Sequence, residues 1–88
     1  RKREGEMELK VVDLFGKTFS VFLSVEASVE DLLLAIQDRQ GITPDQQRLI
    51  HEGTQIQVDM PAARTKTLAS CGLRDGSLLY LVLRVRGC

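Results

Sequence analysis

The sequence predicts a single α+β domain in which one helix covers one face of a mixed β-sheet, with the elements in the order β-β-α-β-β. Several short segments show the two-residue alternation of strands, whereas only one segment has apolar residues at helical spacing. A lone amphipathic helix must bury its apolar stripe against the sheet, because no other element can cover it. A chain of 88 residues has room for one such domain.

The first two strands are predicted to form an N-terminal hairpin. Residues Met7–Asp13 read MELKVVD, and residues Lys17–Leu23 alternate in the same way. The short connection between them contains Gly16, the residue best able to adopt a positive φ. Residues 1–6 are charged, contain glycine and lack periodicity, so we expect them to form a solvated linker.

The helix has clear signals at both ends. Ser28 occupies the position of an N-cap, and Asp31 lies three residues later, as in a capping box. Gly41 is expected at the C-terminal end, and Pro44 prevents continuation. Its buried stripe is predicted to contain Val29, Leu32, Leu33 and Ile36.

The second half of the chain is predicted to supply two more strands. Residues Gln46–His51 form the third strand, residues Gln57–Thr67 form a polar loop, and residues Ser77–Val85 form the last strand after the Asp75-Gly76 turn. The last strand is apolar on both faces, which favours a central place in the sheet. The predicted core is Leu9, Val11, Phe19, Val21, Leu23, Val29, Leu32, Leu33, Ile36, Leu49, Leu68, Leu73, Leu79 and Leu81.

Composition argues against several classes of function. Twelve basic residues balance twelve acidic ones, so the surplus of cations needed for nucleic-acid binding is absent. No apolar run approaches the roughly 18 residues that span a bilayer. Cys71 and Cys88 have no paired spacing, which is typical of a reducing compartment, and one histidine does not make a zinc site. We expect no cofactor and no metal, and a cytoplasmic or nuclear, monomeric domain.

Three motifs identify the chain as similar to the ubiquitin-like superfamily. They are IQDRQGITPDQQRLI at residues 36–50, LVLRVRG at residues 81–87 and FGKT at residues 15–18. The resemblance runs from Met7 to Gly87 and implies a β-grasp fold, with the domain at residues 7–86 and a tail at 87–88. It also implies an apolar binding patch at Leu14, Ile50 and Val82, with Tyr80 where ubiquitin has histidine and with Arg48 and Arg84 as flanking cations.

Strand alternation predicts the same surface independently of the resemblance. If Leu49 and Leu81 face the helix, then Ile50, Tyr80 and Val82 face away from it. The free face of an antiparallel sheet is normally polar, so an apolar patch there indicates a protein-binding site. We therefore predict a noncovalent interaction module whose partners, by resemblance, are ubiquitin-binding domains, proteasomal receptors or ubiquitin-pathway enzymes. The alternative is that the patch packs against the loop at residues 57–67 or against another domain of the same polypeptide.

Departures from the ubiquitin pattern limit what the resemblance implies. Ubiquitin-type modifiers end in Gly-Gly, whereas this chain ends in Gly87-Cys88, so conjugation is the alternative function and requires a processed C-terminus. The chain lacks an initiator methionine, and Cys88 is interpreted as a residue of a longer polypeptide or as an engineered thiol. Most of the lysines that link ubiquitin chains are absent; Lys17 remains. The extended loop at 57–67 is interpreted as a tolerated insertion instead of a recognition element.

The sequence contains no evident catalytic set. A nucleophile needs a positioned base, and His51 has no apparent cysteine partner, so His51 is expected to border the binding face. The pair Glu30 and Asp31 belongs to a helix start. Gly16-Lys17-Thr18 lacks the earlier glycine and the strand-to-helix context of a phosphate-binding loop. The chain is therefore expected not to be an enzyme.

Overall fold

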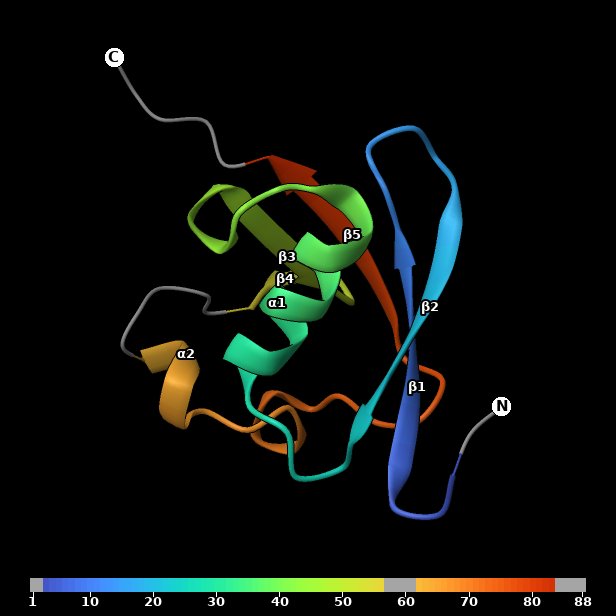
Figure 1. The fold of residues 1–88 in the computed structure, drawn as a ribbon, viewed down its shortest axis with the longest axis vertical. Coiled ribbons are helices and arrows are strands. Elements are labelled where there is room, and N and C mark those ends of the chain that lie inside the picture. The colour runs from blue at the N-terminus through green and yellow to red at the C-terminus, as the bar shows by residue number, and fades with distance from the viewer. Residues whose placement is uncertain (1–2, 57–61, 84–88) are drawn as a thin grey trace.

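A computed structural model describes residues 3–56 and 62–83 and shows one helix lying across a five-stranded sheet (Figure 1). The strands are β1 (Glu6–Val12), β2 (Thr18–Ser24), β3 (Gln47–His51), β4 (Thr54–Gln55) and β5 (Leu78–Leu83). Their order in the sheet is β2-β1-β5-β3-β4. Because β1 and β5 run parallel while the other pairs are antiparallel, the sheet is mixed and the predicted β-grasp architecture is confirmed. The central position of β5 agrees with its two apolar faces.

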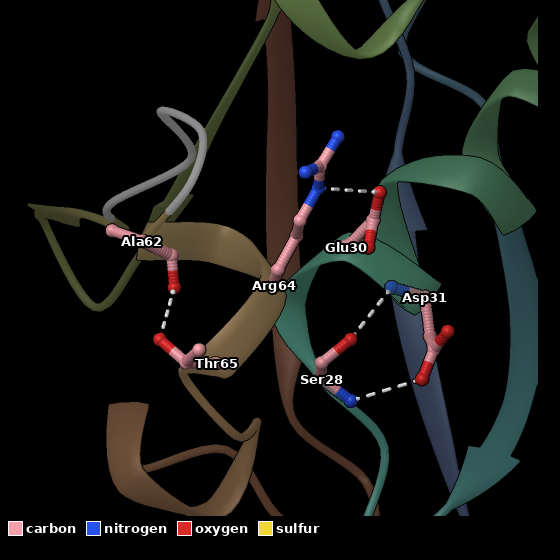
Figure 2. Close-up of polar contacts among 6 residues, drawn as sticks. All are labelled: Ser28, Glu30, Asp31, Ala62, Arg64 and Thr65. Atoms are coloured by element: carbon pink, nitrogen blue, oxygen red, sulfur yellow. Dashed lines mark hydrogen bonds and ion pairs between the residues drawn. The ribbon is translucent and has the colours of Figure 1, made fainter.

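The helix α1 (Val29–Gln40) begins and ends at the predicted residues. The Ser28 hydroxyl accepts a hydrogen bond from the Asp31 backbone N–H at 3.2 Å, and the Asp31 carboxylate accepts one from the Ser28 N–H at 3.1 Å (Figure 2). These two bonds satisfy backbone donors that the first turn leaves unpaired. Gly41 follows with φ 74°, a left-handed conformation that glycine adopts without strain.

The core lies between α1 and the inner face of the sheet. All four residues of the predicted helical stripe are buried, and they contact the buried residues of the strands. Phe19 and Leu23, which the sequence placed in the core, are only partly buried, because β2 is an edge strand that α1 covers incompletely. Among the described residues, four further buried apolar residues lie outside the predicted core: Met7, Ala27, Ile56 and Ala63.

The segment after β3 differs most from the sequence prediction. Glu52 and Gly53 both have positive φ, 52° and 80°, which is the geometry of a two-residue type I′ hairpin turn, and the turn leads into the unpredicted strand β4. Residues 62–65, predicted as loop, form the short helix α2 (Ala62–Thr65), whose Ala63 side chain is buried in the core. Residues 57–61 of the predicted loop lie outside the described residues.

Helix α2 is tied to the start of α1 (Figure 2). The Arg64 Nε lies 3.5 Å from the Glu30 carboxylate, and the Lys66 carbonyl accepts a hydrogen bond from the Val29 N–H at 2.8 Å. The ion pair is solvent-exposed and contributes less than about 1 kcal/mol. Burial of Ala63, the hydrogen bond to Lys66 and the ion pair together hold α2 against the start of α1.

Gln47 is a buried polar residue at the start of β3. Its side-chain Nε2 donates hydrogen bonds to the Leu33 and Ile42 carbonyl oxygens, each at 2.9 Å. The amide thus connects α1, the segment that follows the helix and β3 in one network. Its Oε1 is buried and has no hydrogen-bond partner among residues 3–56 and 62–83.

The N-terminal residues join the sheet earlier than expected. Residues 3–6 were expected to belong to a solvated linker, but Glu6 is the first residue of β1, and its N–H donates to the Arg3 carbonyl at 3.0 Å. The Gly5 carbonyl accepts a hydrogen bond from the Val25 N–H at 2.9 Å. In the described part of the chain, no helix has the length and apolar composition that a membrane span requires.

Candidate protein-binding surface

The outer face of the sheet carries a row of apolar side chains that register places side by side. Tyr80 of the central strand is opposite Val12 of β1 on one side and opposite Ile50 of β3 on the other. Val82, two residues along β5, is opposite Arg48. Directly opposed residues in a sheet have their Cβ atoms about 5 Å apart, so these side chains form one continuous surface.

Burial along the strands shows that these residues face away from α1. Leu49 and Leu81 are buried in the core beneath the helix. The residues next to them along β3 and β5, which include Ile50, Tyr80 and Val82, are not buried. Tyr80 is 50% exposed, and Ile50 and Val82 are partly buried by their neighbours. The alternation predicted from the sequence therefore holds in both strands.

Leu14 lies in the loop that joins β1 to β2 and is 40% exposed. Val12 and Tyr80 are partners in the parallel strands β1 and β5, and Leu14 and Val82 each come two residues later. Leu14 and Val82 therefore belong to the same end of the sheet. Figure 1 shows this loop at the end of the sheet where β5 finishes. We name Leu14, Ile50, Tyr80 and Val82 the outer patch. Arg48 is exposed beside it, and the predicted Arg84 lies outside the described residues.

His51 lies at the end of β3, at the edge of this surface. Alternation places it on the opposite side of β3 from Ile50, and its side chain is only 12% exposed, 3.8 Å from the Glu52 carboxylate. It does line a hollow of about 320 Å³ beside the outer patch, together with Tyr80, Leu78 and Arg74. His51 is therefore a rim residue of this hollow.

The sequence reasoning missed the extension of the apolar surface along β5. Leu78 is 40% exposed and points in the same direction as Tyr80, two residues before it. Its partner on the adjacent strand β1 is Lys10, so the apolar surface ends there against a charged side chain. The two-residue spacing of Leu78, Tyr80 and Val82 was the signal in the sequence that could have identified it.

A second hollow, of about 190 Å³, brings together His51 and Cys71, which the sequence reasoning did not pair. Lys66 and Ile56 also line it. Within residues 3–56 and 62–83, no hydrogen bond or ion pair links the Cys71 thiol to the His51 ring, and such a link is what activates a cysteine nucleophile. The same described residues contain no cluster of three His, Cys, Asp or Glu side chains that would hold a metal ion.

A mixed sheet covered by one helix on its inner face and carrying an apolar patch on its outer face defines a ubiquitin-like β-grasp domain. The ubiquitin family model matches residues 8–86, and the chain belongs to the ubiquitin family. It is 33% identical over 81 residues to the ubiquitin-like protein NEDD8 of Dictyostelium discoideum, covering 92% of this chain and 97% of that protein.

Two further similarities come from a large protein and from a designed one. The chain is 35% identical over 79 residues to the large proline-rich protein bag6-A of Xenopus laevis, covering 90% of this chain but 6% of that protein. A solved structure of a designed protein based on ubiquitin superimposes with a TM-score of 0.78 at 25% identity, covering 97% of this chain and 96% of that one. The resemblance to the ubiquitin-like superfamily is thus confirmed, together with the fold.

Proposed function

We propose that this domain is a noncovalent protein-interaction module that binds partners of the ubiquitin pathway or the proteasome through the outer patch. The observation that carries the proposal is the register of β1, β5 and β3, which sets Val12, Tyr80 and Ile50 in one outward row. An exposed apolar row on a sheet face that water would otherwise solvate is typical of a docking surface.

The composition of the surface favours a partner that presents an apolar helix or strand with an acidic edge. Ile50 and Val82 form the apolar floor, Tyr80 offers an aromatic ring with a hydroxyl group, and Arg48 lies at the border. Buried aromatic and aliphatic anchors supply most of the binding energy at such interfaces, whereas border charges set orientation and association rate. We further propose that binding takes place in the cytoplasm or the nucleus, without catalysis by this domain.

Replacing Ile50 by alanine should weaken binding of a ubiquitin-binding helical domain about tenfold or more, because the contact at the centre of the patch is lost. The measurement is a titration of the ¹⁵N-labelled domain followed by amide chemical shifts. Phe22→Ala is the control, since Phe22 is an exposed apolar residue of β2 whose partner on β1 is Glu8 and not a patch residue.

Shifts should be confined to β3, β5 and the loop that contains Leu14, and Phe22→Ala should bind like the parent chain. Shifts elsewhere on the surface, or equal binding by the Ile50→Ala variant, would reject the outer patch as the binding site. Circular dichroism of each variant separates loss of binding from loss of fold.

The second candidate function is that of a covalently attached modifier. The similarity to the Dictyostelium NEDD8 protein over 97% of that protein's length favours it. Among modifiers of this family the terminal glycine carboxylate is activated, whereas this sequence has Cys88 after Gly87. The family relationship therefore supports the candidate, whereas Cys88 after Gly87 departs from the Gly-Gly pattern of those modifiers.

Incubation with ubiquitin-type activating enzymes and ATP should yield a thioester for the Cys88→Gly variant and none for the chain that ends in Cys88. The physical reason is the side chain at the last position, which the narrow channel of an activating enzyme would have to accept. An adduct that requires ATP and is cleaved by thiol is the readout, because disulfides of Cys71 or Cys88 need no ATP. An ATP-dependent adduct of the unaltered chain would make the modifier the primary function.

A further inference from the structure

A groove on the helix side of the domain combines an apolar floor with an acidic rim. It has a volume of about 520 Å³ and lies between the end of β2 and the exposed side of α1. Its apolar lining comes from Leu23, Ala27, Leu34 and Ala35, and its charged lining from Glu26, Asp31 and Asp38. Ser24 completes the lining, so no described cation contributes to it.

The nearest described cations of the helices are directed elsewhere. Arg39 donates from Nη1 to the Ser20 carbonyl at 3.1 Å, and its guanidinium lies 5.0 Å from the centroid of the Phe19 ring. Arg64 pairs with Glu30 on the α2 side of the helix (Figure 2). Among the described residues, the groove is therefore lined by carboxylates and by no cation.

The carboxylates of the groove have different amounts of unused hydrogen-bonding capacity. One oxygen of Asp31 already accepts the Ser28 N–H of the capping box, so this side chain is held in place. Within the described residues, the side chains of Glu26 and Asp38 make no hydrogen bond or ion pair. These two carboxylates can accept charged donors from a ligand without giving up contacts inside the domain.

We propose that this groove binds a basic amphipathic helix of another protein. Leu34 is 45% exposed and gives the groove an accessible apolar side chain between the carboxylates of α1. Asp31 and Asp38 are seven residues apart, so they lie two turns and about 10 Å apart on one side of α1, with Leu34 between them. A partner helix with an apolar residue flanked by Lys or Arg one turn away on each side matches this pattern.

The groove and the outer patch are on opposite sides of the sheet. Leu23 alternates with Phe22 and belongs to the inner side of β2, whereas Ile50 and Tyr80 belong to the outer face. Both surfaces are therefore open to ligands at the same time. The inference does not depend on the proposed function, and it gives the domain two independent binding sites.

The test uses a synthetic helix-forming peptide of Lys, Leu and Ala, with lysines one turn on either side of each leucine, and a control peptide with Glu in place of Lys. Titration of the ¹⁵N-labelled chain with the lysine peptide should shift amides of residues 23–38 to saturation. The double variant Glu26→Gln/Asp38→Asn should bind about fivefold to tenfold more weakly, and added salt should weaken the parent complex. Leu34→Ala should also weaken it.

Two variants serve as controls for this site. Glu52→Gln removes an exposed carboxylate at the β3–β4 turn and should leave binding unchanged. Ile50→Ala should also leave the affinity for the lysine peptide unchanged. This variant therefore tests the groove and the outer patch separately. Equal binding of the glutamate peptide, shifts centred on β3 and β5, or an unaltered affinity of the double variant would overturn the proposal. Sedimentation should show a monomer. If the free chain dimerised and the Leu34→Ala variant did not, the occupant of the groove would be a second copy of this chain and the proposal would be overturned.

Discussion

Replacing Leu33 by alanine should lower the free energy of unfolding by about 3 kcal/mol, because it removes a fully buried side chain from the centre of the helix–sheet interface. Leu33 belongs to the buried stripe of α1 and to the same core cluster as Leu49 and Leu81. The loss combines the transfer of the removed methyl groups from the core to water with the energy of the remaining cavity.

The adjacent residue provides the control for this prediction. Leu34→Ala makes the same chemical change one position along α1, where the side chain is 45% exposed, and should alter stability by less than about 0.5 kcal/mol. Urea denaturation followed by circular dichroism measures the stability of both variants. The dependence of the free energy of unfolding on urea concentration should be the same for the two. Similar losses for the two variants would contradict the burial that the structure assigns to this helix.

Replacing Gln47 by leucine should lower the free energy of unfolding by about 2 kcal/mol, although the substitution keeps the volume of the side chain and increases its hydrophobicity. The variant loses the two Nε2 hydrogen bonds, and the Ile42 and Leu33 carbonyls are left without this donor in the interior. An unmade hydrogen bond to a buried group costs about 1–3 kcal/mol, and two such losses together exceed the roughly 1.5–3 kcal/mol gained by burying a leucine side chain.

Gln46→Leu is the matched control, since Gln46 is exposed and precedes Gln47 directly. It should change stability by less than about 0.5 kcal/mol. Hydrogen exchange adds a second readout, because loss of the network should speed exchange in β3 and in the C-terminal turn of α1. If Gln47→Leu proved as stable as the parent chain, the two hydrogen bonds would make no net contribution to the fold.

Local sequence patterns were sufficient to predict the helix and most of the strands. Ser28, Asp31 and Gly41 define the ends of α1 through hydrogen bonds and a backbone angle that depend on neighbouring residues only. Strand alternation likewise predicted that Ile50, Tyr80 and Val82 face away from the helix. The assignment of these residues to partner binding remains a prediction, since their positions do not identify what they bind.

Other features required the tertiary structure because they depend on contacts between distant residues. The buried place of Ala63 arises where α2 packs on α1, and the hydrogen bonds of Gln47 join groups 14 and 5 residues away. His51 and Cys71 come to one hollow only through the path of the chain after β4. The acidic groove is similar: Glu26 and Asp38 become neighbours only when α1 lies against the end of β2.

The sequence alone thus determined which face each residue of a strand or helix presents, since alternation and helical periodicity are properties of the local backbone. The tertiary structure decided which faces meet, which polar groups find partners in the interior, and where carboxylates gather without cations. These depend on the relative placement of whole elements, and burial and long-range hydrogen bonding become defined only when those elements pack together.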